Sequence, residues 1–389
     1  MRQPAHGGNL AWAAALAGCP PDAILDFSAS ISPLGPPNSA IAAIQSQIGN
    51  LKHYPDPNYS ELRLALSHFH QLPPEWILPG NGSAELLTLI GRELAELAAT
   101  ILITPAFGDY YRTLRAYNAN LLECPLSLVS QCGLLPRGDA KGDSAALASY
   151  RASGGFPHEQ LRTRKVTGHW SLFADTGDRT NDKGLLLNNP HNPTGKLFSR
   201  DSILPYLEQF ALVVVDEAFM DFVPPNEEQS LIPVVQEYAN LVVLRSLTKF
   251  YSLPGLRLGY AIAHPDCLAK WQLWRDPWPV NTLAAAAAIA ALQDTEFQQQ
   301  TWAWLPPARN QLFQGLAEIS GLQPQVSAAN FLLVKSQEST SQLQQQLLKH
   351  HQILIRDCLS FKELGDRFFR VAIRSDSDNQ RLLTALKES

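Results

Sequence analysis

The stretch L-V-V-L-R-S-L-T-K-F-Y-S-L-P-G-L-R-L-G, residues 241–259, says more about fold and chemistry than any other part of the chain. Its apolar, β-branched start (241–244) predicts a buried strand. Polar and basic side chains follow that run: Ser246, Thr248, Lys249 and Arg257. A lysine that forms an imine needs a fixed site that favours its neutral amine, and the hydroxyls and guanidinium around it suit a phosphate. Most lysines are solvated surface residues, so a cofactor site requires matching residues elsewhere.

Composition sets the general class of protein. The chain has 389 residues, 45% of them hydrophobic and 17% charged, as in an ordinary globular protein with one large and one smaller domain. A net charge of -5 favours neither nucleic acid nor an anionic membrane as partner. The cysteines are odd in number and lack metal-ligand spacing, so we expect no disulfide framework, no metal site and a cytoplasmic location. They are Cys19, Cys124, Cys132, Cys267 and Cys358.

The N-terminal region contains one apolar segment that needs interpretation. Residues 10–19, L-A-W-A-A-A-L-A-G-C, resemble a short secretion signal. The apolar stretch is at the short end of such signals, and a single arginine precedes it. We therefore interpret the segment as an Ala-rich helix, and no apolar run is long enough to predict a membrane span.

Short apolar runs alternate with helix-length segments through most of the chain. Continuous Val/Ile/Leu runs without alternation are typical of parallel strands that are covered on both faces. Strands are predicted at 100–104, 185–187, 211–215 and 241–244, and helices at 84–98 and 199–210. This order predicts an α/β fold with a mostly parallel, doubly wound sheet. Ligands of such sheets bind beyond the carboxyl ends of the strands.

The remaining segments complete the predicted organisation. After an Ala-rich helix at 282–292, a smaller α+β domain is predicted, with helices at 308–319 and 340–350 and strands at 331–335, 353–356 and 368–374. Residues 127–183 lack periodicity and predict an irregular surface insertion. The predicted division is an N-terminal arm (1–35), a large domain (36–285) and a small domain (286–389).

Each predicted strand end carries a polar group that suits one part of pyridoxal 5′-phosphate (PLP). Asn192 can donate to a phenolate oxygen, and Asp216 can pair with a protonated pyridine nitrogen, which keeps the ring an electron sink. Phe107 can stack on the ring. In P-G-N-G-S-A-E-L (79–86) a Gly-rich turn runs into a helix with Ser83 at the cap position, where backbone amides can hold a phosphate.

The motifs together carry a family resemblance. They are G-N-G-S-A-E (80–85), T-P-A-F (104–107), N-P-T-G (192–195), D-E-A-F (216–219), S-L-T-K (246–249) and G-L-R-L-G (255–259). In this order they resemble the fold-type I PLP-dependent enzymes, and within them the class I/II aminotransferases. The resemblance covers nearly the whole chain except 127–183.

The resemblance implies a role for each matched residue. Lys249 would bind the cofactor as an imine, Asp216 would pair with the pyridine nitrogen, Asn192 would contact the phenolate oxygen, and Phe107 would stack on the ring. The phosphate would be held by Ser83, the amide of Ala84, Ser246, Arg257 and a tyrosine of the neighbouring subunit, which Tyr54 matches. The family therefore implies a homodimer with shared active sites.

The two ends of the chain indicate which group of these enzymes the sequence resembles. Segments 6–10, 25–37, 355–361 and 369–374 resemble the threonine-phosphate decarboxylases of cobalamin biosynthesis. These enzymes convert L-threonine O-3-phosphate to (R)-1-aminopropan-2-yl phosphate. Arg370 would lie near the carboxylate of this small phosphorylated amino acid, and Arg356 near its phosphate, because an arginine fork binds either oxyanion. The resemblance also implies that His6 lies beside the phosphate. Ser30 occupies a position where these decarboxylases commonly have asparagine, and it would contact the substrate.

Two other functions stay open on this evidence. The chain also resembles histidinol-phosphate aminotransferases, whose substrate likewise carries a phosphate and an amine, and a non-catalytic PLP-binding regulator is a third possibility. Many aminotransferases have a tyrosine three residues after the aspartate, where this chain has Phe219. Loss of that hydroxyl is compatible with a reaction other than amino-group transfer.

Overall fold

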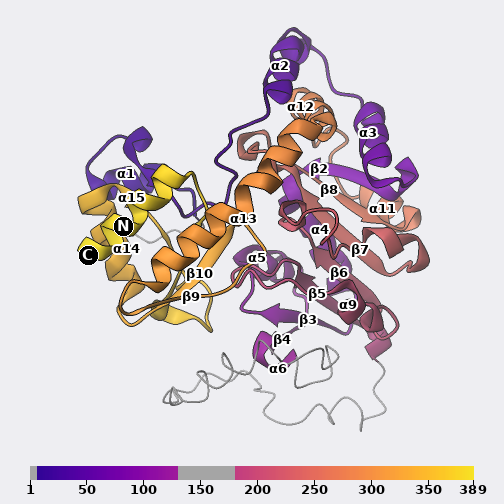
Figure 1. Cartoon of the computed structure of the whole chain (residues 1–389). Helices are drawn as coiled ribbons and strands as arrows, with labels where there is room; N and C mark the ends of the chain where they lie inside the picture. The colour runs from indigo at the N-terminus through magenta and orange to yellow at the C-terminus, as the bar shows by residue number, and fades with distance from the viewer. Residues whose placement is uncertain (1–6, 130–179) are drawn as a thin grey trace.

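A seven-stranded sheet forms the centre of the chain in the computed structural model, which describes residues 7–129 and 180–389 (Figure 1). Its strand order is β2-β8-β7-β6-β5-β3-β4. The strands are β2 (Ile77–Asn81), β3 (Ala99–Thr104), β4 (Leu121–Pro125), β5 (Lys183–Asn188), β6 (Leu212–Asp216), β7 (Leu241–Ser246) and β8 (Leu258–Ala263). Neighbours from β7 to β4 are parallel, whereas β8 is antiparallel to both β7 and β2.

The apolar runs form strands because both faces of this sheet are covered. All residues of β3, β5, β6, β7 and β8 are buried. Alternate side chains enter different cores: Val213 and Val215 pack in one core, and Val214 in the other. The helices that contribute to the Val214 core are α4 (Gly82–Ala95), α5 (Gly108–Ala116) and α11 (Pro265–Gln272), and those on the opposite side are α3 (Ser60–His70), α9 (Arg200–Leu207) and α12 (Thr282–Gln293).

A second, antiparallel sheet lies in the C-terminal part, and we call it the C-terminal sheet. Its order is β12 (Arg356–Asp357), β13 (Phe368–Ala372), β10 (Phe331–Ser336) and β9 (Leu322–Pro324). The helices packed on it are α13 (Thr295–Ala317) and α14 (Thr340–His351), and α15 (Asp376–Glu388) packs on both of these helices. Helix α13 runs from α12 to this sheet and so connects the two parts of the molecule (Figure 1).

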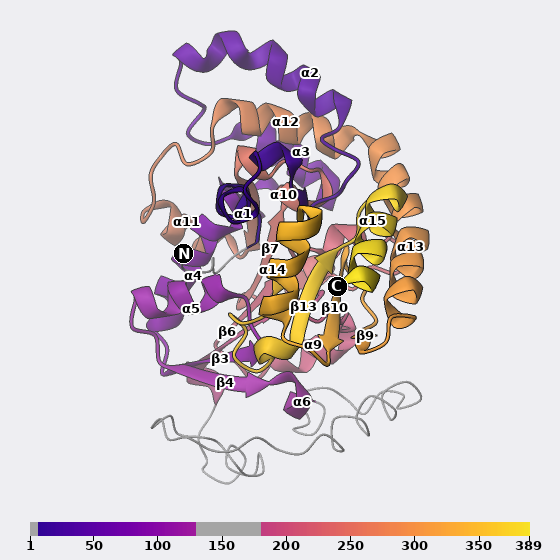
Figure 2. The same cartoon turned by 90° about the vertical axis from the view of Figure 1, so that its left-hand side faces the viewer.

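The N-terminal segment packs on the C-terminal part, although the two are far apart in sequence. Helix α1 (Leu10–Ala17) lies beside α14 in both views (Figures 1 and 2), and β1 (Leu25–Asp26) pairs in parallel with β11 (Ile353–Leu354). The chain then returns to the large part, where α2 (Asn38–Gln47) packs on α12. Short helices complete the described chain: α6 (Leu126–Val129), α10 (Leu247–Phe250) and the 3₁₀ turns Pro21–Ala23, Ile48–Lys52, Pro74–Trp76, Thr180–Asp182, Met220–Phe222, Ile232–Glu237, Pro254–Leu256 and Gly365–Arg367.

The predicted α/β architecture with a mostly parallel sheet is confirmed, and so are the predicted helix near residue 10 and the strands 100–104, 185–187, 211–215 and 241–244. One element differs in kind. The predicted strand 353–356 is two short strands in different sheets, because Ile355 separates β11, which pairs with β1, from β12, which pairs with β13.

The predicted helix 308–319 is part of the longer α13. Most of the predicted insertion 127–183 lies outside the described residues, and the domain boundaries after 35 and 285 remain predictions. In the part of the chain that the structure describes, no helix combines the length and apolar character needed to span a membrane.

Candidate active site

The side chains predicted to bind a cofactor meet at one edge of the seven-stranded sheet. Strands β5, β6 and β7 are parallel neighbours, so their carboxyl ends lie side by side. Asn192 follows β5, Asp216 ends β6, and Lys249 follows β7 in the one-turn helix α10. The structure therefore brings together residues that are up to 57 positions apart in the chain, from 192 to 249.

Lys249 lies in surroundings whose burial and positive charge favour its neutral amine. Its Nζ donates a hydrogen bond to Thr248 Oγ1 at 3.0 Å. Burial, reinforced by the nearby positive charge of Arg257 and opposed by Asp216, lowers the pKa of Lys249 to about 8. An amine that loses its proton near neutral pH can act as a nucleophile and as an acid or base.

The N-terminal segment runs close to this lysine. The amide of Ser32 donates to the carbonyl oxygen of Lys249 at 3.0 Å, and Ser252 Oγ donates to the carbonyl oxygen of Ser32 at 2.6 Å. A segment that is far from Lys249 in sequence is thus fixed against its turn.

The start of α4, the end of β7 and the start of β8 lie close together. Ser246 pairs in register with Gly259, and a Cβ atom at Gly259 would lie 2.6 Å from the amide nitrogen of Ser83. A Cβ atom at Gly82, whose φ is +71°, would lie 2.6 Å from Nη2 of Arg257. The two glycines therefore let the start of α4 approach Ser246 and Arg257, and helix N-terminal amides beside a guanidinium suit an anion.

The position predicted for Ser83 is wrong in one respect. Helix α4 begins at Gly82, with Asn81 before it, so Ser83 lies inside the first turn and does not cap the helix. The left-handed backbone of Gly82 turns the chain one residue earlier than the pattern suggested. Ala84 follows in the same turn, and the amides of both residues belong to the first turn of the helix, where no partner within the helix is available.

Asp216 is a buried carboxylate with two hydrogen-bond donors. Its Oδ1 accepts from the amide of Ala218 at 3.0 Å, and its Oδ2 accepts from the hydroxyl of Tyr110 at 2.7 Å. Burial raises the pKa of Asp216, while Tyr110, Ala218 and Lys249 act against that rise. The ring of Tyr110 also meets Phe107 edge to face, with centroids 5.7 Å apart.

Tyr110 is a site residue that the sequence did not single out. It lies three positions after Phe107 in F-G-D-Y, the spacing that places two side chains on one face of a helix. That spacing was visible, but nothing in it pointed to the carboxylate, which lies 106 positions away.

A second buried charge cluster stabilises the same strand ends. Arg245 precedes Ser246, and Glu217 follows Asp216, so these two side chains alternate with the site residues. Arg245 Nε contacts Glu217 Oε2 at 3.0 Å, its Nη2 contacts Glu228 at 2.6 Å, and its Nη1 pairs with Asp221. These carboxylates raise the pKa of Arg245 well above its usual value, despite burial, and keep it charged.

Arg370 links the two sheets. It lies on β13, yet its Nη1 donates to Asn192 Oδ1 at 2.5 Å, and its Nη2 donates to the carbonyl oxygen of Ser28 at 3.3 Å. The amide group of Asn192 is therefore available on its nitrogen side. Arg370 is only 8% exposed, and within residues 7–129 and 180–389 it forms no ion pair with a carboxylate.

Arg356 lies directly across the C-terminal sheet from Arg370. The two residues are register partners of β12 and β13, so their side chains leave the same face. Burial and the charge of Arg356 lower the pKa of Arg370 to about 10. Arg356 itself donates to Ser360 Oγ at 2.6 Å and lies 3.7 Å from Asp357. A pocket lined by parts of segments 7–12 and 354–357 and by Ser28 and Gln344 includes Arg356.

The structure does not place three of the predicted site residues in contact with the side chains described above. Ser30 is buried, and its hydroxyl has no hydrogen-bond partner among the described residues. His6 lies outside the described residues. The ring of Tyr54 is 79% exposed and stacks on Trp278, which is not one of the predicted site residues.

Comparisons with known proteins agree with this geometry. The model of the aminotransferase class I and II family matches residues 22–386. The chain belongs to this family. It is 36% identical to a threonine-phosphate decarboxylase from Salmonella typhimurium, over 98% of this chain and 96% of the relative.

Two solved structures are similar to this member of the class I and II aminotransferase family. A histidinol-phosphate aminotransferase from Clostridium acetobutylicum is 26% identical, with a TM-score of 0.75 over 94% of this chain and 98% of that chain. An L-threonine-O-3-phosphate decarboxylase from Porphyromonas gingivalis is 22% identical, with a TM-score of 0.74 over 93% and 98%. The predicted family and fold are confirmed.

The class I and II aminotransferases use PLP, and the residues at the sheet edge fit this cofactor. Two glycines, Gly82 and Gly259, let the amide of Ser83 and the guanidinium of Arg257 lie near Ser246, a set of donors that suits a phosphate. Asp216 is a buried carboxylate near the lysine amine. The individual roles of these residues and of Ala84, Phe107 and Asn192 remain predictions.

The lowered pKa of Lys249 predicts how cofactor attachment depends on pH. Only the neutral amine reacts with an aldehyde, so attachment of PLP to the apoenzyme should become faster as pH rises through about 8 and then level off. Borohydride trapping at short times, followed by peptide mapping, measures the attached fraction. Lys249→Ala is the control and should trap none at this position. A midpoint near the usual 10.5 of lysine would contradict the prediction.

Removal of the Tyr110 hydroxyl should weaken the cofactor site without disturbing the fold. Tyr110→Phe removes one of two donors to Asp216, which raises the pKa of that carboxyl further and weakens its pairing with a protonated ring. The dissociation constant of PLP should increase about tenfold, as expected for a hydrogen bond to a charged group. Titration of apoenzyme measures it.

Tyr111→Phe is the matched control, because the hydroxyl of Tyr111 bonds to Glu123 instead. Equal PLP affinity in the two variants would refute a role for Tyr110.

Proposed function

We propose that this chain catalyses the PLP-dependent decarboxylation of L-threonine O-3-phosphate to (R)-1-aminopropan-2-yl phosphate, a step of cobalamin biosynthesis. The observation that carries the proposal is the pair of buried arginines on neighbouring strands. Arg370 has no carboxylate partner among the described residues, and the positive charge of Arg356 lies beside it. Two adjacent cations are unfavourable in a protein interior unless anions bind there.

A substrate with one carboxylate and one phosphate supplies those anions. Arg370 contacts Asn192 and is electrostatically coupled to Lys249, so its anion would lie beside the cofactor. Arg356 borders the pocket under the N-terminal segment, which also includes Ser28. We assign the carboxylate to Arg370 and the phosphate to Arg356, with Ser30 and His6 on the phosphate side. The identity to a threonine-phosphate decarboxylase supports this assignment.

When bound, PLP provides an electron sink for the pair left on Cα as the bond to the carboxylate breaks. The chain supplies the rest. Asp216, stabilised by Tyr110, holds a negative charge where the protonated ring nitrogen would lie. Arg370 orients the carboxylate so that this bond, and not Cα–H, is the one that breaks. As carbon dioxide leaves, Lys249 Nζ, whose pKa of about 8 allows both protonation states, delivers a proton to Cα.

The reaction itself provides the test. Purified protein with PLP should release carbon dioxide from L-threonine O-3-phosphate and form 1-aminopropan-2-yl phosphate in equal amount, without a 2-oxo acid. Arg370→Lys should lower kcat/KM by roughly two to three orders of magnitude, because a point charge replaces a bidentate donor. Arg367→Lys, an exposed position on the same segment, is the control and should change little.

Formation of glutamate from histidinol phosphate and 2-oxoglutarate, without decarboxylation, would contradict the proposal. That outcome would identify a histidinol-phosphate aminotransferase.

We also propose a homodimer in which Tyr54 reaches the phosphate of the partner's cofactor. Helix α2 projects from the molecule (Figure 1), and beyond it Ile48 and Leu51 are 55% and 56% exposed, close in sequence to the exposed Tyr54. Such an apolar surface is typical of a subunit contact. Free cysteines at positions 19, 267 and 358 support a reducing, cytoplasmic location.

Leu51→Asp should produce monomers in analytical ultracentrifugation, because it places a charge in the proposed contact. Val326→Asp, at another exposed apolar position, should leave the dimer intact. Shared sites predict complementation: a mixture of Tyr54→Ala and Lys249→Ala subunits should regain activity, because one site of each mixed dimer is unmodified. A wild-type monomer, or mixtures without recovery, would contradict this arrangement.

A further inference from the structure

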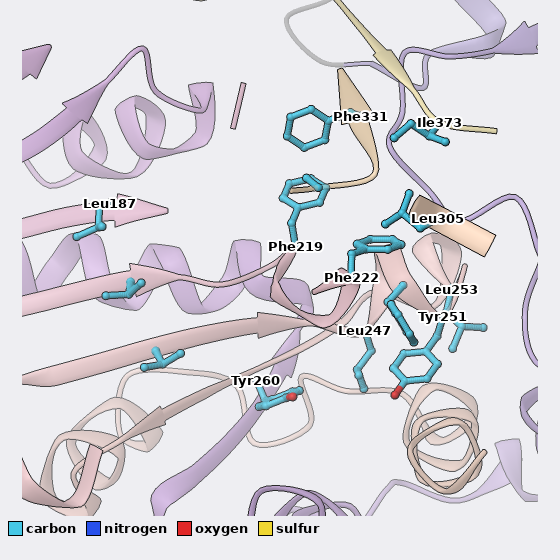
Figure 3. Close-up of a cluster of buried hydrophobic side chains, with 14 of the residues drawn as sticks. Leu187, Phe219, Phe222, Leu247, Tyr251, Leu253, Tyr260, Leu305, Phe331 and Ile373 are labelled. Atoms are coloured by element: carbon cyan, nitrogen blue, oxygen red, sulfur yellow. The ribbon is translucent and has the colours of Figure 1, made fainter. Parts of the chain in front are cut away.

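An aromatic ring, Phe331, lies against the buried guanidinium of Arg370, and a second ring, Phe219, packs on Phe331. Phe219 follows β6, and Phe331 begins β10 of the C-terminal sheet. Their ring centroids are 5.0 Å apart and their planes meet at 79°, an edge-to-face contact (Figure 3). The guanidinium carbon of Arg370 lies 4.8 Å from the centroid of the Phe331 ring. Phe331 is therefore shared between an aromatic neighbour and a cation.

The Phe331 ring gives the Arg370 guanidinium a contact that its hydrogen bonds do not provide. Nη1 and Nη2 have partners in Asn192 and Ser28, but Nε has no hydrogen-bond partner among the described residues. With no carboxylate paired to it there, the cation is stabilised in part by the negative face of the Phe331 ring. Two single hydrogen bonds leave the guanidinium free to tilt, whereas a ring at 4.8 Å limits its plane.

Phe219 packs against the Phe331 ring from the loop that follows β6. It lies three residues after Asp216, which is the last residue of β6. Both Phe219 and Phe331 are buried in the core that also contains Val213 and Val215. Figure 3 shows both rings with other hydrophobic side chains of this core, among them Ile373 and Leu305. The edge-to-face contact thus connects the strand end that carries Asp216 to the strand that faces Arg370.

We propose that Phe331, supported by Phe219, is a positioning residue that sets the plane of the Arg370 guanidinium for a substrate carboxylate. This inference rests on the proposed function, and it explains what the phenylalanine at position 219 does. The pair determines specificity for the carboxylate and has no part in recognition of the phosphate.

A matched pair of ligands without an amine tests the inference, because neither can react with the cofactor. One is 2-hydroxy-3-(phosphonooxy)butanoate, which has the carboxylate, and the other is 1-hydroxypropan-2-yl phosphate, which lacks it. Calorimetry on the PLP-loaded protein measures both affinities. Phe331→Leu should weaken the first ligand by about twofold to thirtyfold, the range of a cation–π contact, and leave the second unchanged. Phe219→Leu should give a smaller loss of the same kind.

Two further variants separate positioning from general packing. Phe331→Tyr keeps the ring face and should bind the carboxylate ligand about as tightly as the wild type. Phe222→Leu changes a phenylalanine of the same core that contacts Phe250, and it should lower stability without selective loss of either ligand.

Equal weakening of both ligands in Phe331→Leu, or no weakening, overturns the inference while the proposed function stands. A wild-type protein that does not prefer the carboxylate ligand overturns the proposed function, and the inference with it.

Discussion

Strands β5, β6 and β7 run parallel and end side by side, and every feature of the candidate site depends on this. Parallel neighbours place their carboxyl ends at one edge, so Asn192, Asp216 and Lys249 are brought together by strand pairing. Because side chains alternate along each strand, Asp216 and Ser246 alternate with Glu217 and Arg245, which form a buried ion pair. The same strand ends thus carry the site on one side and a stabilising charge cluster on the other.

The second part of the site depends on contacts between distant segments. The C-terminal sheet contributes Arg356 and Arg370, and the N-terminal segment contributes the carbonyl oxygen of Ser28 and the turn around Ser32. A hydrogen bond from Arg370 to Asn192 joins the residues expected to hold substrate to those expected to hold PLP. Substrate and cofactor would therefore be recognised by one connected network, in which a shift of the C-terminal sheet changes both.

Much of the fold could be predicted because it follows from local pattern. The all-apolar runs predicted buried parallel strands, and the order of helices and strands predicted a doubly wound sheet. The direction of β8 and the division of 353–356 between β11 and β12 could not be predicted, because each depends on which distant strand offers free hydrogen-bonding groups. The start of α4 was misplaced because Gly82 adopts a left-handed backbone and a side chain there would meet Arg257, a residue 175 positions away in the chain.

Residue types and their order in the chain determined the family, the cofactor and the candidate residues, since motifs such as S-L-T-K and D-E-A-F need particular side chains at short spacing. Tertiary structure alone decided that Tyr110 donates to Asp216 and that Arg370 has no acidic partner in the described chain. It also decided that the Phe331 ring lies against Arg370 and that Phe219 packs on that ring. Tyr110 and Asp216 are 106 positions apart in the chain, Phe219 and Phe331 are 112 apart, and Phe331 and Arg370 are 39 apart. No spacing rule reaches that far, because the distance between such residues is set by how the sheets pack and not by the chain that connects them.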